Sequence, residues 1–322
     1  MTAFDARCGL CRAHGIQETA RTLDFGGVEK WFALECSHCG MLYEDLDAVA
    51  GSIEMANGEG VMACTKEQDF GCDIYTLRML AARFGLAARP QSRDQEDALA
   101  DPHSRLAGMA TTIPLETLAP MPLTLGIMCR AHELDLALEK FKAIRQELAQ
   151  CIIVLDRAAD DWTEPATGFA ELRVVCRPLN RQFHAQRNFI QDLSTTDWVL
   201  QLDLDESLDL LLLNRLRRLA TLAQEQSLLS IGLPRRNFVD GTLSDLYPDV
   251  QYRLNHRSVR FEGVVHERPS RPWQRSMIAI GIDIDHHLEG THVRRRSHRY
   301  DDILPGGGRK EEESILTTPF RA

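Results

Sequence analysis

The spacing of apolar and polar residues becomes regular at Leu123 and stays regular to Leu202. Short apolar runs alternate there with longer amphipathic stretches. The runs predict strands at 123–128, 151–155, 172–176 and 198–202, and the stretches predict helices at 133–150 and 185–193. Because strands and helices that alternate along a chain usually build a parallel sheet covered by helices, we expect an α/β fold with a mostly parallel sheet.

A less regular pattern continues beyond this region. It predicts a helix at 207–226, a strand at 228–233, a loop with a turn at 235–241, a pair of strands at 251–256 and 259–266, and a strand at 277–284. Two histidines, His286 and His287, follow the last of these ranges. We therefore expect both of them to lie beyond the end of a strand.

The periodicity is weaker before residue 121. A strand is predicted at 31–35 and a helix within 73–86, whereas 89–105 is polar and charged, as linkers are. Prolines 114, 120 and 122 mark the approach to the regular region. We therefore divide the chain into a segment at 1–50, a helical segment and linker at 51–120, an α/β domain at 121–292, and a basic segment with a flexible tail at 293–322.

Four cysteines in the first segment have the spacing of a metal site. They form two CxxC motifs, Cys8 with Cys11 and Cys36 with Cys39. Each CxxC bends the backbone so that two thiolates reach one ion, and two such pairs complete a closed tetrahedral Zn²⁺ site. The stretch from about Ala6 to Tyr43 resembles a zinc ribbon, so we expect structural zinc.

Other readings of the cysteines remain open. The four thiols could instead be buried or redox-active, and His14 and His38 are close enough in sequence to replace a ligand. Cys64 and Cys72 have a spacing that fits no common metal site, so we expect them to be buried as small apolar side chains.

Composition narrows the class of protein. The chain has 322 residues, of which 44% are hydrophobic, which is enough for a sizeable core. Its 47 acidic and 37 basic residues give a net charge of -10, which argues against a general nucleic-acid binder. We find no apolar run of about 20 residues that would cross a membrane and no signal peptide, so we expect a cytoplasmic protein whose nine cysteines are reduced.

An acidic stretch directly follows the predicted strand at 198–202. Asp203 and Asp205 are two residues apart, so both side chains project to one side if the strand continues. Ligands of open parallel sheets bind beyond the carboxyl ends of the strands, and paired carboxylates there suit Mg²⁺ or Mn²⁺. Alternatively, the stretch is an acidic first turn of the helix predicted at 207–226. No glycine-rich phosphate loop follows any predicted strand, so metal and side chains would have to hold phosphate.

Several motifs together carry a resemblance to a known family. They are Arg130-Ala131-His132-Glu133, Asp156 at a strand end, Phe183-His184-Ala185-Gln186-Arg187-Asn188, Asp203-Leu204-Asp205-Glu206, Tyr252-Arg253-Leu254 and Gly263-Val264-Val265-His266-Glu267. From Leu123 to about Gly290 the chain resembles an inverting family 2 glycosyltransferase of the GT-A fold, in particular the branch with lipopolysaccharide-core sugar transferases. Cys129-Arg130 and Arg157-Ala158-Ala159-Asp160 depart from the family pattern.

The resemblance implies a role for each matching residue. It assigns binding of a nucleotide-diphosphate-sugar donor to Arg130, Asp156, Gln186, Arg187, Asn188 and Asp203. It assigns the divalent cation to Asp203 and Asp205. Histidines beyond a strand end could complete the shell of that cation, so His286 is a further candidate ligand. Glu267 would be the base that takes the acceptor's proton, with Glu262 as the other candidate.

Each assignment has a structural alternative. Asp156 could be a turn or cap residue, Arg187 a solvated side chain, Glu267 part of an exposed turn, and the histidine pair simply polar. The arginines at 293–300 either close over the donor or are a solvated charge run.

Three functions compete. The first is a metal-dependent inverting glycosyltransferase, whose acceptor the sequence leaves open among a sugar, a lipid-linked sugar, a small molecule and a peptide. The second is a catalytically idle scaffold with a zinc-ribbon interaction module. The third is another nucleotide-sugar or nucleotidyl enzyme, such as a pyrophosphorylase, which the missing glycine-rich loop disfavours.

Overall fold

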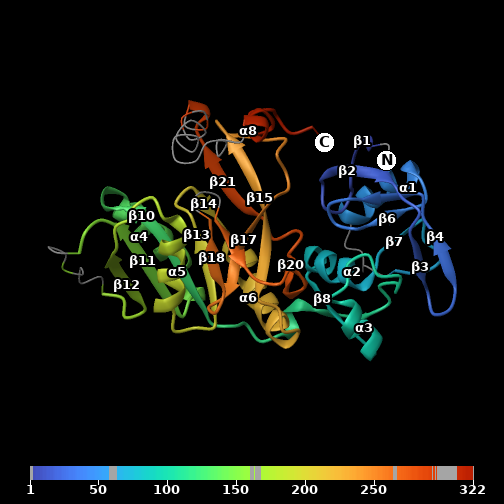
Figure 1. Ribbon diagram of the computed structural model, residues 1–322, viewed down its shortest axis with the longest axis horizontal. Helices are drawn as coiled ribbons and strands as arrows, with labels where there is room; N and C mark the ends of the chain where they lie inside the picture. Colours follow the sequence, from blue (N-terminus) through green and yellow to red (C-terminus); the bar gives the residue numbers. More distant parts are fainter. Residues whose placement is uncertain are drawn as a thin grey trace. The chain divides into compact units, whose positions relative to one another are not determined.

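The structure, a computed structural model, describes residues 3–57, 64–159, 163, 168–263, 267–291, 293, 295 and 310–321. The chain divides into two compact units (Figure 1). Unit 1 comprises residues 1–118, 277–282 and 322, and unit 2 comprises 119–276 and 283–321. Predictions that concern residues 264–266 and 296–309 lie outside the described residues.

Unit 1 contains an antiparallel sheet in the order β1-β2-β5-β6-β7, the hairpins β3-β4 and β8-β9, and three helices. The strands are β1 (Ala3–Arg7), β2 (His14–Glu18), β3 (Thr22–Asp24), β4 (Glu29–Trp31), β5 (Leu34–Cys36), β6 (Leu42–Tyr43), β7 (Phe70–Gly71), β8 (Leu86–Arg89) and β9 (Thr111–Pro114). The helices, counted among the described residues, are α1 (Leu46–Asn57), α2 (Ile74–Ala81) and α3 (Arg93–Ala98).

Two predicted elements of unit 1 differ from those observed. The strand expected at 31–35 is divided between the end of β4 and the start of β5. Asp73 caps α2 by accepting a hydrogen bond from the Thr76 amide at 2.7 Å, as a helix start requires. The helix ends at Ala81 rather than near residue 86, because Gly85 adopts a left-handed conformation (φ 66°) and the chain turns into β8.

Unit 2 is built on one large mixed sheet. Its strands are β10 (Leu123–Arg130), β11 (Gln150–Asp156), β12 (Leu172–Cys176), β13 (Trp198–Leu202), β14 (Glu206–Ser207), β15 (Ser230–Val239), β16 (Thr242–Leu243), β17 (Asp249–His256) and β21 (Ile284–Leu288). A separate hairpin pairs β18 (Arg260–Glu262) with β19 (Arg268–Ser270). The helices with described bounds are α4 (Leu134–Ile144), α5 (Phe183–Leu193), α6 (Leu210–Glu225) and α8 (Lys310–Leu316). The strand β20 (Ser276–Ile278) spans the division between the two units.

The strand order places a reversal in the middle of this sheet. The order is β12-β11-β10-β13-β17-β15-β21-β14, and the first four strands are parallel (Figure 1). Successive strands are added in one direction from β10 to β12, and β13 is then added on the other side of β10. Such a reversal leaves a crevice at the carboxyl ends of the two central strands, where open α/β sheets bind ligands.

The α/β class is confirmed, but the expectation of a mostly parallel sheet is wrong for the second half. There β17 is antiparallel to both β13 and β15, and β14 is antiparallel to β21. The connection from β15 to β17 is short, and a short connection can join only antiparallel neighbours. The sheet is therefore parallel at the β10 side and mixed beyond β13.

Helix α5 packs closely on the parallel half. Its fully buried Ile190 contacts Ile152, Val154 and Val199 of the sheet. Burial of such a side chain stabilises the fold by about 1.5–3 kcal/mol. A Cβ on Gly126 would lie 2.5 Å from Ile190 Cγ2, so this position of β10 requires glycine.

Three predictions for the last third of the chain are corrected. β15 continues to Val239 through the range expected to be a loop, and the turn follows at Asp240 and Gly241, both with positive φ. β21 contains His286 and His287, which were expected beyond a strand. The strand expected at 277–284 is interrupted, because Gly281 has a φ of 85° and its Cα hydrogens face the Arg83 backbone.

Among the described helices, none is both long and apolar enough to cross a membrane.

Candidate functional site

The four cysteines of the two CxxC motifs meet in unit 1. All four are buried, and their sulfur atoms lie within 4.8 Å of one another. The Sγ atoms of Cys8 and Cys39 are 3.7 Å apart, and those of Cys11 and Cys36 are 3.6 Å apart. Thiolates bound to one tetrahedral Zn²⁺ at about 2.3 Å lie about 3.8 Å apart, so the group can hold a metal ion such as zinc.

The two motifs have matching backbone turns. In the first, the Arg12 amide donates to the Cys8 carbonyl at 2.9 Å; in the second, the Gly40 amide donates to the Cys36 carbonyl at 2.8 Å. Arg12 (φ 66°) and Gly40 (φ 83°) both adopt left-handed conformations. Each turn therefore presents two thiols on one side, as a metal knuckle requires.

Other candidate ligands lie outside this group. His14 and His38 are exposed. Cys64 and Cys72 are buried with their sulfurs 2.9 Å apart, and neither belongs to the group. Within the described ranges, the four cysteines form the only group of three or more histidine, cysteine or acidic side chains with metal-site spacing.

The acidic stretch of unit 2 forms a turn between β13 and β14. The alternative of an acidic first helical turn is wrong, because α6 begins at Leu210 with four leucines and is capped by Asp209, which accepts from the Leu212 amide at 2.8 Å. Glu206 is fully buried and accepts from the Asp203 amide at 3.1 Å. The turn therefore fixes Asp203 relative to the strand end.

Arginines from three other elements neutralise this turn. Asp203 accepts from Arg187 Nη2 at 3.1 Å and from Arg253 Nη2 at 2.5 Å. Glu206 accepts from Arg253 at 2.5 Å and from Arg235 Nη1 at 3.1 Å. Burial opposes ionisation of Asp203, but the Arg253 and Arg187 guanidinium groups outweigh it and hold the Asp203 pKa well below its usual range. We call Asp203, Glu206, Arg187, Arg235 and Arg253 the acidic centre.

Glu267 is tied to the acidic centre through Arg187. Arg187 Nε donates to Glu267 Oε1 at 2.5 Å, and Arg187 Nη1 donates to the side-chain amide oxygen Oε1 of Gln201 at 3.4 Å. The Glu267 side chain is 12% exposed, so it is neither fully buried nor part of a freely exposed turn. The neighbouring Asn188 exchanges two hydrogen bonds with the Phe261 backbone, at 3.0 and 2.7 Å, and so holds β18 to α5.

Asp205 has a different environment from Asp203. Its side chain is 43% exposed, and its Oδ2 lies 3.1 Å from Nε2 of the buried His286. The backbone amide of the next histidine, His287, donates to the Asp205 carbonyl at 3.0 Å. The ring of His287 is stacked on Phe238 with the ring centroids 5.2 Å apart.

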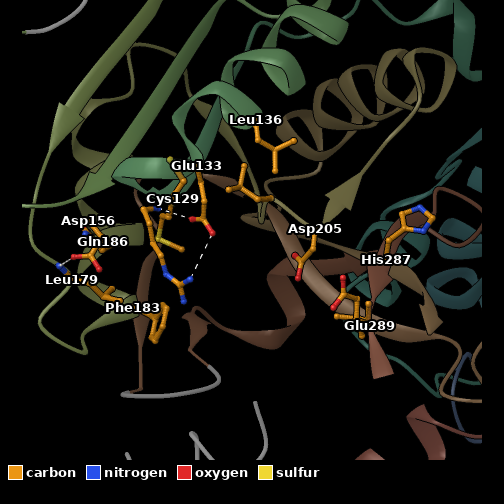
Figure 2. A pocket seen from close by; sticks show the side chains of 14 residues that line it. Cys129, Glu133, Leu136, Asp156, Leu179, Phe183, Gln186, Asp205, His287 and Glu289 are labelled. Carbon is orange, nitrogen blue, oxygen red and sulfur yellow. Dashed lines mark hydrogen bonds and ion pairs between the residues drawn. The ribbon is translucent and has the colours of Figure 1, made fainter. Parts of the chain in front are cut away.

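A pocket of about 650 Å³ opens beside Asp205 (Figure 2). One wall comes from the ends of β10 and β11 and from α5, and includes Arg130, Glu133, Asp156 and Gln186. The other wall comes from the turn after β13 and from the end of β21. It contributes Leu204, Asp205, His287, Leu288 and Glu289. The pocket therefore lies at the reversal of strand order between β10 and β13.

Predicted residues in the pocket are held by local hydrogen bonds. Asp156 Oδ1 accepts from the Leu179 amide at 2.8 Å, which fixes one oxygen of an otherwise exposed carboxylate. Gln186 is buried, with its amide bonded to Arg177 at 2.6 and 3.1 Å. The Arg130 amide donates to Glu133 Oε2 at 2.7 Å, and the Arg130 guanidinium lies 3.9 Å from Glu133 Oε1.

The structure thus divides the predicted site residues into two sets. Four of them line the pocket: Arg130, Asp156, Gln186 and Asp205. Within the described part of the chain, the other five are not among its lining residues: Asp203, Arg187, Asn188, His286 and Glu267. Arg253 and Arg235 had no predicted role. The motif Tyr252-Arg253-Leu254 was the one signal in the sequence for Arg253, and Arg235 had none.

Comparisons with known proteins add little to these observations. No protein-family model matches the chain, and no curated protein matches it. Among solved structures, the chain is similar to the crystal structure of S. aureus TarS 1-349, with 12% sequence identity and a TM-score of 0.34. The match covers 57% of this chain and 66% of that one, just under two thirds of its length. At this TM-score the likeness carries no argument about fold or activity.

Proposed function

We propose that unit 2 is a metal-dependent inverting glycosyltransferase of the GT-A fold, as the family 2 motifs imply, and that the cysteine group of unit 1 holds structural Zn²⁺. The donor is a nucleotide-diphosphate sugar. The observation that carries the proposal is the position of the pocket: four residues assigned to donor and cation binding line it at the point where the strand order reverses.

The charges in the pocket support a cation requirement. Its lining contains four carboxylates, from Glu133, Asp156, Asp205 and Glu289, against one arginine and one histidine. A diphosphate placed there would meet net negative charge, so its binding needs a cation. Asp205 Oδ2 and His286 Nε2 are 3.1 Å apart, and two ligands of one octahedral Mg²⁺ or Mn²⁺ lie about 3 Å apart.

Asp203 has a different role in this proposal from the one expected. Because two guanidinium groups occupy its oxygens, it orients the turn that carries Asp205. The cation, held by Asp205 and His286, would stabilise the charge of the diphosphate leaving group.

Glu267 is the proposed base. An inverting transfer requires a carboxylate that removes the acceptor's proton while the acceptor attacks opposite the leaving group. Arg187 bonds to both Glu267 and Asp203, and so fixes the carboxylate relative to the turn beside the pocket. An ion-paired carboxylate is also a weaker base, which favours the second candidate function, an idle transferase-like scaffold with a zinc-ribbon module.

The decisive experiment is a calorimetric titration of nucleoside diphosphates with and without Mn²⁺. The parent should bind one of them only when Mn²⁺ is present, and Asp205→Asn should lose this binding because a hard oxygen ligand becomes a neutral amide. Asp209→Asn is the matched control, since Asp209 caps α6 and does not line the pocket. Equal binding with and without Mn²⁺, or an unaffected Asp205→Asn variant, would reject the metal role. Turnover across a donor and acceptor panel then separates the enzyme from the scaffold.

A further inference from the structure

Asn237 is a buried amide on the strand next to His286. It lies in β15, which pairs in parallel with β21, and Asn237 and His286 are direct partners in that register. Asn237 is 0% exposed and His286 is 1% exposed. Asn237 Oδ1 lies 2.7 Å from His286 Nδ1.

The hydrogen bonds of Asn237 determine which way its amide faces. Its Nδ2 lies 3.2 Å from the Leu246 carbonyl and 3.2 Å from Asp249 Oδ2, and both of these atoms accept. Asp249 is ionised, because the adjacent Arg235 outweighs the effect of burial and lowers the Asp249 pKa to about 2. Both Nδ2 hydrogens are therefore donated, and Oδ1 faces His286 as an acceptor.

This orientation selects one tautomer of His286. Since Oδ1 accepts, Nδ1 must carry hydrogen, and the lone pair of the neutral ring is then on Nε2. Nε2 faces Asp205 Oδ2 at 3.1 Å. The Nε2 lone pair and the Asp205 carboxylate are then directed at the same place, as two ligands of one cation would be.

We propose that Asn237 is the positioning residue of the cation site. It acts through His286, by fixing the tautomer and the ring orientation that direct Nε2 toward the cation; this inference rests on the proposed cation site at Asp205. A histidine that binds a metal usually donates its other ring N–H to an acceptor, and loss of such an acceptor typically weakens metal affinity about 10–100-fold.

The test is Mn²⁺ binding by the full zinc-loaded chain, measured by electron paramagnetic resonance at one pH without nucleotide. Asn237→Leu has a similar volume but cannot accept, so we expect Mn²⁺ to bind about 10–100-fold more weakly. The matched control is Asn255→Leu, since Asn255 is equally buried and bonds to Ser230 and the Tyr252 carbonyl instead of to a histidine.

A second measurement does not depend on the metal. Imidazole ¹⁵N shifts of His286 should report Nδ1–H in the parent and a loss of this preference in Asn237→Leu. A parent ring whose Nδ1 carries no hydrogen would overturn the inference even if Asn237→Leu failed to fold. Equal Mn²⁺ affinity of Asn237→Leu and Asn255→Leu would also overturn it. If the parent binds Mn²⁺ no better than Asp205→Asn, the proposed cation site itself fails, and the inference fails with it.

Discussion

The cysteine group of unit 1 and the acidic centre of unit 2 both gather ionisable side chains in buried positions, but the charges are balanced differently. The cysteine sulfurs lie close to one another, with the Tyr43 hydroxyl 3.1 Å from Cys8 Sγ, and four thiolates at this spacing would need a metal ion to balance their charge. In the acidic centre, Arg187, Arg235 and Arg253 supply the positive charge from within the chain. With zinc bound as proposed, the first cluster would take its balancing charge from an external ion, whereas the second takes it from arginines of the chain.

The largest expected effect is on the cysteine group. In a Cys36→Ser, Cys39→Ser variant, zinc should fall from about one ion per chain to none, and unit 1 should lose its ordered structure, since structural zinc contributes about 10–16 kcal/mol of apparent binding free energy. Metal analysis and near-ultraviolet circular dichroism would measure both changes. Unit 2 has a core of its own and should stay folded.

The control for this variant is replacement of Cys64 and Cys72 by serine, which removes two buried thiols of the same unit. Zinc content should then be unchanged. Retention of zinc by the Cys36→Ser, Cys39→Ser variant would show that the cysteine group is not the metal site.

Loss of the buried Arg253 guanidinium should destabilise unit 2. Arg253→Met leaves Asp203 and Glu206 with less positive charge in a buried setting, and loss of one partner of a buried ion pair costs about 3–5 kcal/mol. Urea unfolding at neutral pH would measure this loss. Arg257→Met is the control: its pair with Asp197 is exposed and should contribute about 0–1 kcal/mol. Equal stability of the two variants would contradict the account of the acidic centre.

The third prediction asks whether Glu267, which Arg187 ties to the acidic centre, serves catalysis. Glu267→Gln keeps an oxygen that can accept from Arg187 but cannot take a proton, so turnover should fall about 10²–10⁴-fold while nucleotide-sugar and Mn²⁺ affinity are retained. Release of nucleoside diphosphate would measure turnover. Glu262→Gln, at an exposed residue of β18, is the control. Near-parental turnover of Glu267→Gln would move the base to Glu262 or Asp240.

The smallest expected effect is the acid sensitivity of unit 2. The pKa of Asp249 is lowered to about 2, because Arg235 outweighs the effect of burial. A carboxylate with a depressed pKa stabilises the fold above its unfolded pKa of about 3.9, and this contribution of about 2–3 kcal/mol is lost as pH falls from about 4 to 2. Urea midpoints of parent and Asp249→Asn between pH 6 and 2.5 would measure it. Their difference should shrink as pH falls, and a constant difference would refute the assignment.

The sequence predicted best what is encoded locally. The spacing of Cys8, Cys11, Cys36 and Cys39 was sufficient to identify their cluster, because each CxxC turn forms within five residues. The strands at 172–176 and 198–202 have the predicted ends, since both are short apolar runs bounded by polar residues. The parallel half of the sheet followed from the alternation of these strands with α4 and α5.

The sequence failed where polar residues are buried by partners far along the chain. Residues 235–237 were predicted to be a loop because Arg235 and Asn237 are polar, yet in β15 they bond to Asp249, Glu206 and His286. For the same reason, His286 was placed beyond a strand rather than within β21. Hydrophobic periodicity reports no pairing across such distances, so Arg235 and Arg253 could not be assigned a role.

Unit 1 is not contiguous, and this has a consequence for its biosynthesis. Residues 277–282 belong to it, and a Cβ on Gly281 would lie 2.8 Å from the Arg83 Cα. Arg83 in turn donates to the carbonyl of Leu10, inside the first CxxC turn, at 2.9 Å. Domains usually fold in order of synthesis, but here the ribosome must add most of unit 2 before the last piece of unit 1 emerges. All four cysteines therefore leave the ribosome before unit 2 does, whereas residues 277–282, which lie against Arg83 of the same unit, are added only after residue 276.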